Sequence, residues 1–457
     1  MARIKTDICI IGAGSGGLSV AAGAVQMGAK VVLIEAHKMG GDCLNYGCVP
    51  SKALLAVGKM HPVPDFAAAK DYVQGVIDTI APLDSQERFE GLGVRVIRAQ
   101  ARFISKTEVQ AGDTVITARR FVVATGSGPL IPPIPGINEV AVHTNETIFE
   151  LRQKPRHLLI IGGGPIGMEM AQAHLRLGCQ VTVIEGARAM SKDDPDLAAL
   201  LLVQLRAEGI EILEGAKAER ITGFDGDITV HTTKGDFTGS HLLIAVGRKV
   251  NVAGLDLDKA GVAFDGMGVK VRADLRSLTN RRVYAIGDAA GGMQFTHVAG
   301  YHAGVIIRSM LFALPSRQRT DHIPWATYTD PELAQVGLTE AQARMKHADA
   351  LQVVNYDFKH NDRAIANGNR VGRIKVMVVK GRPVGASILG AQAGELIGLW
   401  AMAISNRMKM SAIAATVLPY PTLGEVNKRA AGAYFSPKLF ESPVVKSVVG
   451  LVQRFLP

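Results

Sequence analysis

One pattern of residues occurs twice in this 457-residue chain and limits the fold more than any other feature. An apolar run is followed by a glycine-rich turn, a stretch of small residues, a second apolar run and an acid, first over Asp7–Glu35 and again over His157–Glu185. A strand, a glycine turn, a helix and a second strand in this order begin a dinucleotide-binding fold. The sequence therefore predicts an α/β protein with two Rossmann-like dinucleotide-binding domains.

The glycines of each turn predict how the two nucleotides are held. The first two glycines let the backbone approach a pyrophosphate, the next helix supplies N–H donors, and the acid accepts ribose hydroxyl groups. Glu185 favours NAD(H) over NADP(H), because a 2′-phosphate would meet a like charge there, whereas Arg188 nearby keeps NADP(H) open. The residues predicted to bind are Gly12, Gly14, Gly17 and Glu35 in the first motif, and Gly162, Gly164, Gly167 and Glu185 in the second.

Two cysteines, Cys43 and Cys48, lie close together in the stretch Gly40–Lys52. On an ideal helix residues five apart rise by about 7.5 Å and point about 140° away from each other, which is too far for a disulfide. We therefore expect an irregular helix start, for which Gly47 is suited. A helix N-terminus and Lys52 would lower the pKa of at least one thiol, so the pair is interpreted as redox-active rather than structural. Cys9 and Cys179 are interpreted as buried small apolar residues.

Composition excludes several other classes of protein. The net charge of +10 favours anionic partners such as dinucleotides or anionic lipid, although a basic, solvated surface explains it equally well. No run of Lys and Arg, no zinc-type cysteine spacing and few aromatic residues argue against nucleic-acid binding and against a metal site. No apolar stretch is long enough to span a membrane, and no secretory cleavage site follows the N-terminus, so we expect a cytoplasmic protein.

The pattern changes near Ile323. Strand-like runs over Gly372–Val379 and Pro383–Gly390 precede a helical stretch, Ala393–Arg407, and indicate a separate α+β domain. After Pro443 an amphipathic helix is predicted, with Lys446 and Arg454 off its apolar stripe. We expect it to lie on the protein's own surface or on a second subunit, and weak contact with a membrane surface is the alternative. The stripe comprises Val444, Val445, Val448, Val449, Val452 and Phe455.

Six motifs together resemble one family. The Cys43–Lys52 stretch, the two glycine motifs, Ala124–Ser127, Ala245–Arg248 and Tyr284–Asp288 occur in the order seen in class I pyridine nucleotide-disulfide oxidoreductases. The resemblance covers essentially the whole chain and points to the branch of dihydrolipoamide dehydrogenase and mercuric reductase. It implies a glutathione reductase-like homodimer. The implied domains are the first part of an FAD-binding domain (1–150), an NAD(P)-binding domain (151–250), the second part of the FAD-binding or central domain (251–322), and a dimerisation domain with the C-terminal helix (323–457).

The resemblance also implies roles for individual residues. Cys48 would face the flavin, and Cys43 would be the thiol that attacks the substrate. Lys52 would lie at the flavin and pair with Glu169. Asp288 would bind the ribityl or pyrophosphate part of FAD. The resemblance further implies FAD contacts for Thr125, Gly126, Thr296 and His297, and an NAD(P) contact for Gly247.

One position departs from the disulfide-reducing branch. Where dihydrolipoamide dehydrogenase and glutathione reductase carry a catalytic histidine, this chain has Tyr420, followed by Glu425; both would complete the partner subunit's site. A tyrosine is only about 0.1% ionised at pH 7, so it is a poor general base. Mercuric reductases are similar in carrying a tyrosine near this point and in the stretch Gln294–His297. A plain interface aromatic is the other interpretation of Tyr420.

Three functions are consistent with the sequence. The leading one is an FAD-dependent NAD(P)H oxidoreductase that passes electrons through the Cys43–Cys48 pair to a disulfide or similar small acceptor. The second is a mercuric-reductase-like metal reductase, although the printed sequence has no vicinal cysteine pair near Gln453–Pro457. The third is an NAD(P)H:quinone electron-transfer flavoprotein at a membrane surface, attached by its C-terminal helix.

Overall fold

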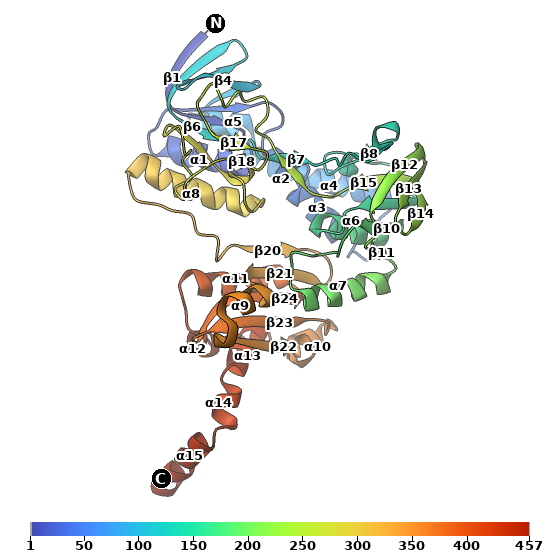
Figure 1. Cartoon of the computed structure of the whole chain (residues 1–457), viewed down its shortest axis with the longest axis vertical. Helices are drawn as coiled ribbons and strands as arrows, with labels where there is room; N and C mark the ends of the chain where they lie inside the picture. Colours follow the sequence, from blue (N-terminus) through green and yellow to red (C-terminus); the bar gives the residue numbers. More distant parts are fainter. Residues whose placement is uncertain (1, 457) are drawn as a thin grey trace. The chain divides into compact units, whose positions relative to one another are not determined.

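The structure is a computed structural model that describes residues 2–456 and divides into two compact units (Figure 1). The first unit comprises residues 2–186 and 213–319. The second comprises residues 187–212 and 320–456.

A seven-stranded sheet forms the core of the first unit. Its order is β3-β2-β1-β6-β5-β4, and β19 pairs with β6. Strands β3, β2, β1, β6 and β19 are parallel to their neighbours, whereas β4 and β5 add an antiparallel edge. The strands are β1 (Ala2–Ile11), β2 (Val31–Glu35), β3 (Arg95–Arg98), β4 (Ala101–Ser105), β5 (Glu108–Ala111), β6 (Thr114–Val123) and β19 (Val283–Ala285).

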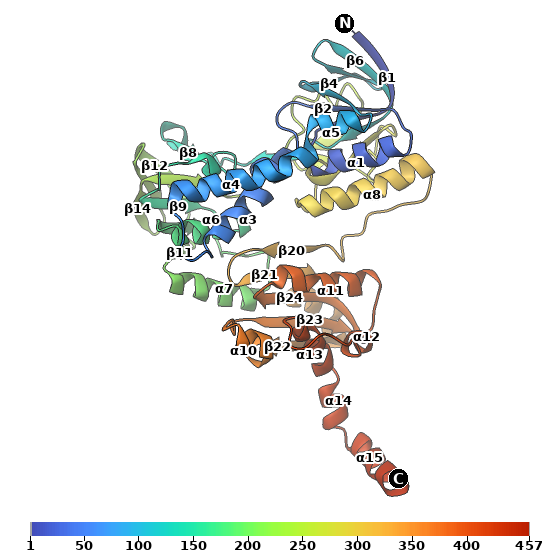
Figure 2. The same cartoon turned by 180° about the vertical axis from the view of Figure 1, so that it is seen from behind.

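Both faces of this sheet are covered. Cys9 and Ile11 of β1 belong to one apolar cluster, whereas Ile8 and Ile10 belong to a second cluster on the opposite face. Alternate strand residues point to opposite faces, so an unbroken apolar strand is what a doubly covered sheet requires. Helices α1 (Ser15–Gln26) and α8 (Thr296–Phe312) lie side by side over the second face (Figure 2). A side chain at Gly16 would crowd Ala299 of α8, which explains the small residues of α1.

A second parallel sheet lies in the same unit. Its order is β11-β10-β9-β15-β8, with β10, β9, β15 and β8 parallel. These strands are β8 (Val142–His143), β9 (His157–Ile161), β10 (Gln180–Glu185), β11 (Glu211–Glu214) and β15 (His241–Ile244). An antiparallel sheet flanks it, formed by β12 (Ala218–Phe224), β13 (Asp227–Thr232) and β14 (Gly235–Gly239). The two short pairs are β7 (Ser127–Pro129) with β16 (Arg248–Val250), and β17 (Phe264–Asp265) with β18 (Gly268–Val269).

Helices of the first unit connect its two parallel sheets. Helix α3 contacts both α4 and α6, and Figure 2 shows the three helices next to one another. Since α3 begins at Cys48 within the cysteine stretch and α6 follows the second glycine turn, these two motifs come together. Besides α1 and α8, the α-helices of the first unit are α2 (Gly41–Asn45), α3 (Cys48–Val57), α4 (Phe66–Ile80), α5 (Gln86–Gly91) and α6 (Pro165–Arg176).

The second unit is an α+β domain. Its antiparallel sheet has the order β20-β21-β24-β23-β22. Helix α11 covers this sheet, with Trp400 fully buried in its core. The strands are β20 (Pro324–Thr327), β21 (Glu332–Gly337), β22 (Leu351–Asp357), β23 (Arg373–Val379) and β24 (Arg382–Gly390). The helices are α7 (Pro195–Glu208), α9 (Glu340–His347), α10 (Asp362–Ala366), α11 (Ala393–Ser405), α12 (Met410–Ala414), α13 (Glu425–Ala433), α14 (Ser436–Phe440) and α15 (Pro443–Phe455).

Helix α7 belongs to this second unit because ion pairs join its N-terminal end to strand β23. Lys375 of β23 is 3% exposed and contacts Asp194 at 2.9 Å, Asp196 at 2.6 Å and Glu340 at 2.8 Å. A buried ammonium group needs such partners, since an unpaired buried charge is costly. Residues 187–212 therefore group with residues 320–456 in one compact unit.

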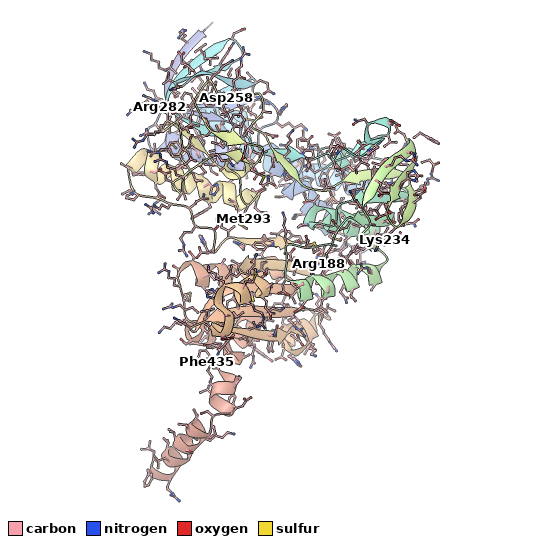
Figure 3. The ribbon with its side chains drawn as sticks, viewed as in Figure 1. Arg188, Lys234, Asp258, Arg282, Met293 and Phe435 are labelled. Atoms are coloured by element: carbon pink, nitrogen blue, oxygen red, sulfur yellow. The ribbon has the colours of Figure 1, made fainter. Side chains whose placement is uncertain are left out.

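The predicted C-terminal helix is present, and the structure bears on one of the two positions expected for it. No residue of α15 is buried, so the helix does not pack on the surface of the described chain. Helices α14 and α15 run away from the sheet of the second unit (Figures 1 and 2), and Phe435 marks the point of departure (Figure 3). Phe435 is the last apolar residue of this region that packs on the core of the second unit.

Candidate active site

The first glycine turn has the shape that a bound pyrophosphate requires. Gly12 has φ +106°, and a Cβ there would collide with the carbonyl oxygen of Ala124. Glu35 holds the turn from the end of β2, because its carboxylate accepts from the N–H groups of Ala13 at 2.6 Å and His37 at 2.7 Å. A carboxylate has about four lone pairs, so each oxygen of Glu35 keeps one for a ribose hydroxyl.

The second turn repeats this geometry. Gly162 has φ +116° and closely approaches Ala245, and Glu185 accepts from the N–H of Gly163 at 2.7 Å. A mainly apolar hollow of about 570 Å³ lies at the carboxyl ends of β9 and β10, where a parallel sheet binds nucleotides. It is lined by Pro132, Pro133, Ile134, Pro135, Ile161, Ile184, Gly186, Ala216, Lys217, Ala218, Glu219 and Val246.

The two cysteines lie on either side of a helix break, as expected. Cys43 is in α2, which ends at Asn45, and Cys48 is the first residue of α3. A Cβ at Gly47 would lie 2.9 Å from a carboxylate oxygen of Asp42 and 3.1 Å from its carbonyl oxygen, so a larger residue would crowd Asp42. Both cysteines are free thiols in the structure, and Cys48 is exposed. The break brings the two sulfur atoms together, which a continuous helix would not do.

Cys48 is the better thiolate of the pair. The Cys43 thiol donates a hydrogen bond to it, the Thr296 hydroxyl lies 3.3 Å from its Sγ, and Lys52 adds positive charge. These contacts lower the pKa of Cys48 to about 6. The pKa of Cys43 is raised, because its thiol donates to Cys48 and is partly buried. The position of Cys48 at the N-terminus of α3 favours the thiolate further.

Lys52 forms the predicted ion pair. Its Nζ lies 2.8 Å from Oε2 of Glu169, which is on α6 and almost fully buried. The Lys52 side chain remains 36% exposed. Glu169 thus fixes the position of a cation one turn after Cys48.

A polar network around Asp288 extends to the cysteine helix. Ser127 donates to Asp288 at 2.5 Å, and Arg248 donates to Ser127 at 2.7 Å. Arg248 also reaches Asp42, the neighbour of Cys43, at 3.1 Å, and Asn145 donates to Asp42 at 2.9 Å. Burial raises the pKa of Asp288. Sequence reasoning predicted Asp288 but missed the other four, although Ser127 and Arg248 end two of the family motifs.

Helix α8 begins at Thr296, the predicted flavin-facing position. His297 is exposed and stacks on Phe295, with ring centroids 5.4 Å apart. Thr125 donates to the carbonyl of Asn251 at 2.6 Å, and the adjacent Gly126 has φ +65°. Gly247, predicted at the other nucleotide, has φ +142°.

Tyr420 and Glu425 belong to the second unit. Tyr420 is 68% exposed, and its hydroxyl donates to Asp362 at 2.8 Å. This hydrogen bond raises the pKa of Tyr420, so even less of the residue is ionised at neutral pH than of a free tyrosine, and it is poorly suited to act as a general base. Glu425 is the first residue of α13. Cys9 and Cys179 are buried, as expected.

The residues of the first unit fit FAD and a nicotinamide nucleotide. Each glycine turn leaves room only for backbone, each is followed by a helix N-terminus, and each has its acid in place. Among residues 2–456, no three His, Cys, Asp or Glu side chains are grouped as metal ligands. Nor does that described part contain a helix with the length and apolar character needed to cross a bilayer.

Comparisons with known proteins decide the family. A model described as "Pyridine nucleotide-disulphide oxidoreductase" matches residues 6–303, and the dimerisation-domain model of the same family matches residues 323–431. The chain belongs to this family. The predicted family, glutathione reductase-like fold class and flavoprotein disulfide reductase activity are thereby confirmed. The family depends on FAD and a pyridine nucleotide, and the dimerisation domain supports a homodimer.

Relatives lie in both predicted branches. Mercuric reductase of Bacillus cereus is 33% identical over 449 residues, which are 93% of this chain and 70% of that protein. Dihydrolipoyl dehydrogenase of Bacillus subtilis (strain 168) is 31% identical over 453 residues, which are 92% of this chain and 96% of that protein. Among solved structures, the HOCl-induced flavoprotein disulfide reductase RclA from Escherichia coli is similar, with a TM-score of 0.87 and 29% identity over 93% of this chain and 99% of that chain.

Proposed function

We propose that the enzyme carries electrons from NAD(P)H through FAD to the Cys43–Cys48 pair and on to a disulfide or similar small acceptor. The observation that supports this most is the set of groups around Cys48: the Cys43 thiol, Thr296 and Lys52 all stabilise its thiolate. A structural cysteine pair has no use for a cation fixed by a buried glutamate. We also propose a cytoplasmic location, because thiol pairs are kept reducible there.

Different residues of this chain would bind the cofactor and carry out the thiol chemistry. When bound, FAD accepts a hydride from NAD(P)H and passes two electrons on. Gly12, Glu35, Asp288 and the N-terminus of α8 would hold it. Cys48 holds the thiolate and Cys43 carries the proton. Transfer of that proton to Cys48 along their hydrogen bond would make Cys43 the nucleophile that attacks the acceptor, and the thiolate released from the acceptor would then take the proton. With a disulfide acceptor, one NAD(P)H and one proton reduce it to two thiols, and NAD(P)⁺ is released.

An anaerobic titration of the holoenzyme with NADH and NADPH tests this proposal. We expect a long-wavelength absorption band, which a thiolate next to flavin produces, and we expect Cys48→Ser to abolish it. Cys9→Ser is the matched control, because Cys9 is a buried thiol of β1 and should leave the band intact. Flavin bleaching without this band in the native enzyme would refute the proposed redox pair.

We propose NADH as the preferred reductant. Glu185 ends β10 and points at the second glycine turn, so a 2′-phosphate would meet its charge. A kcat/KM for NADH at least about tenfold above that for NADPH is the expected result. Glu185→Gln should reduce this ratio by improving the use of NADPH, and an unchanged ratio would remove Glu185 as its cause.

We propose that Tyr420 and Glu425 act on the cysteines of the partner subunit. The dimerisation-domain match contains both residues, which supports a position at a shared site. Because the Tyr420 hydroxyl is engaged by Asp362 and has a raised pKa, it suits substrate contact better than proton removal.

A metal reductase is the second candidate function. Tyr420 favours it, because a thiolate-bound metal substrate needs no base for a leaving thiol, and several relatives are mercuric reductases. A Cu(II) complex of RclA has also been solved. NADPH or NADH oxidation stimulated by Hg(II) in excess thiol would support this function. Without such stimulation, the disulfide or a similar electrophile remains the acceptor.

A further inference from the structure

Helix α15 exposes an unusually continuous apolar surface. None of its residues is buried, and six of its large apolar side chains are between 41% and 71% exposed. Leu439 and Phe440 of α14 extend this surface. Contiguous apolar surface of this kind marks an interaction site. The six side chains are Val444, Val448, Val449, Leu451, Val452 and Phe455.

The helix is fully divided into two faces. At about 100° per residue, every apolar side chain from Val444 to Phe455 falls within one arc of about 160°. Ser447 and Gln453 fall in the opposite arc, together with Pro443 and Gly450. An arc this wide exceeds the narrow seam that one facing helix would cover.

The charges of α15 all have one sign. Lys446 and Arg454 each lie about 60° outside an opposite edge of the apolar arc, and the helix contains no acid. Long basic side chains on the polar face can extend their stems back toward the acyl chains and place their charges among anionic headgroups. Two copies of such a helix would repel each other, whereas an anionic lipid surface would attract it. The net charge of +10 acts in the same direction.

Length and position define how the helix would dock. Thirteen residues span about 20 Å, which is too short for the roughly 30 Å hydrocarbon core, so the helix must lie in the plane of the interface. The dimerisation-domain match ends at residue 431, before α14 begins at Ser436. The family's dimer contact therefore does not by itself account for α15.

We propose that α15 docks this reductase on the surface of an anionic lipid bilayer, with its valine-rich face in the headgroup and acyl boundary and Lys446 and Arg454 among the lipid phosphates. Docking concentrates the enzyme at the bilayer without crossing it. It is independent of which acceptor the cysteine pair reduces.

Vesicle flotation of the full-length holoenzyme tests this. Vesicles of phosphatidylcholine alone are compared with vesicles containing about 30% phosphatidylglycerol, at low and high salt. We expect at least tenfold more bound enzyme on the anionic vesicles, with most of it released by salt. The double variant Val448→Asp/Val452→Asp should lose this binding at least tenfold, whereas Lys446→Gln/Arg454→Gln should remove the preference for anionic vesicles.

Two controls separate docking from misfolding and from dimer contact. Val203→Asp alters another exposed valine of the second unit, on α7, and should bind vesicles normally. All variants should keep the solution turnover and the oligomeric mass of the native enzyme. The proposal is overturned if the native enzyme does not bind anionic vesicles, or if Val448→Asp/Val452→Asp binds them as well as the native enzyme does. It is also overturned if Val448→Asp/Val452→Asp has half the native oligomeric mass, because α15 would then bind a second copy of the chain.

Discussion

Protonation of Cys48 should govern the thiolate signal of the reduced enzyme. The hydrogen bond from Cys43, the Thr296 hydroxyl and the charge of Lys52 lower its pKa to about 6, below the ordinary thiol range. The group is therefore a thiolate above pH 7, and the thiolate is lost as pH falls through about 6. We expect the long-wavelength band of the dithiol holoenzyme to be nearly constant from pH 9 to about 7, to be half lost near pH 6 and to fall to about a tenth near pH 5.

Thr296→Val offers a matched test of this cause. The substitution keeps the shape of the side chain and removes the hydroxyl that lies 3.3 Å from Sγ of Cys48, so the midpoint of the pH curve should move upward. Cys9→Ser should leave the midpoint unchanged. A band that persists unaltered to pH 5, or one already half lost at pH 8, would contradict the assignment of the thiolate to Cys48.

The side chain at position 420 should limit the use of dithiol substrates. Tyr420 donates to Asp362 and has a raised pKa, so it accepts no proton at neutral pH. Imidazole has a pKa near 6.5 and can serve as a base. We expect Tyr420→His to raise kcat for dihydrolipoamide oxidation by NAD⁺ about tenfold or more. Tyr420→Phe is the control, and a histidine variant no faster than it would show that a missing base is not the limit.

Site residues differ in how far the sequence could predict them. Gly12, Glu35 and Cys48 lie in local motifs whose spacing alone indicates the chemistry. Asn145 carries no such signal, because its partner Asp42 is 103 residues away and only the folded chain brings them together. Arg248 lies in a recognised motif, yet its contact with Asp42 depends on the pairing of β16 with β7.

At the scale of elements, α2 owes its position to tertiary contacts. It has five residues, its N-cap residue Gly40 provides no side-chain hydrogen bond, and it is held through Asp42 by Asn145 and Arg248. Asn145→Ala leaves one carboxylate oxygen of Asp42 without this donor inside a partly buried site. We expect the free energy of unfolding to fall by about 1–3 kcal/mol, measured by urea denaturation.

The same substitution should slow the cysteine pair. If α2 shifts, Cys43 no longer donates well to Cys48, and reduction of a model disulfide should fall several-fold with KM for NADH unchanged. Asn251→Ala is the control for stability, since Asn251 makes an exposed side-chain hydrogen bond to Thr125 and should cost less than about 0.5 kcal/mol. Wild-type stability in Asn145→Ala would show that Arg248 alone positions α2.

For the whole molecule, the repeated glycine-turn motif was enough to predict the fold class from the sequence. The division of the chain into two compact units could not be predicted in this way. Two glycine turns 150 residues apart require two parallel sheets, and the structure has them. The sequence of α7 gives no sign that the helix leaves its neighbours, because the reason is Lys375, which lies about 180 residues further along the chain. The amphipathic pattern of α15 predicted its helix but could not show that no part of the described chain covers it.

The proposed shared site makes a prediction about mixed dimers. Cys43→Ser removes the attacking thiol, and Tyr420→Ala/Glu425→Ala removes the residues proposed to reach the partner's cysteines. We expect each variant homodimer to reduce its acceptor at least about tenfold more slowly than the native enzyme. In a hybrid dimer, one site carries both defects and the other carries none. Random reassociation of equal amounts should therefore restore about a quarter of native turnover per chain.

Mixing experiments can exclude the alternative arrangements. If Tyr420 and Glu425 served the cysteines of their own subunit, every site in the hybrid would carry one defect and turnover would stay at the level of the homodimers. If the double variant were as active as the native enzyme, neither residue would contribute to the site. Oligomeric mass measured before and after mixing controls for dissociation. Recovery of activity only after subunit exchange would show that the catalytic unit is the dimer.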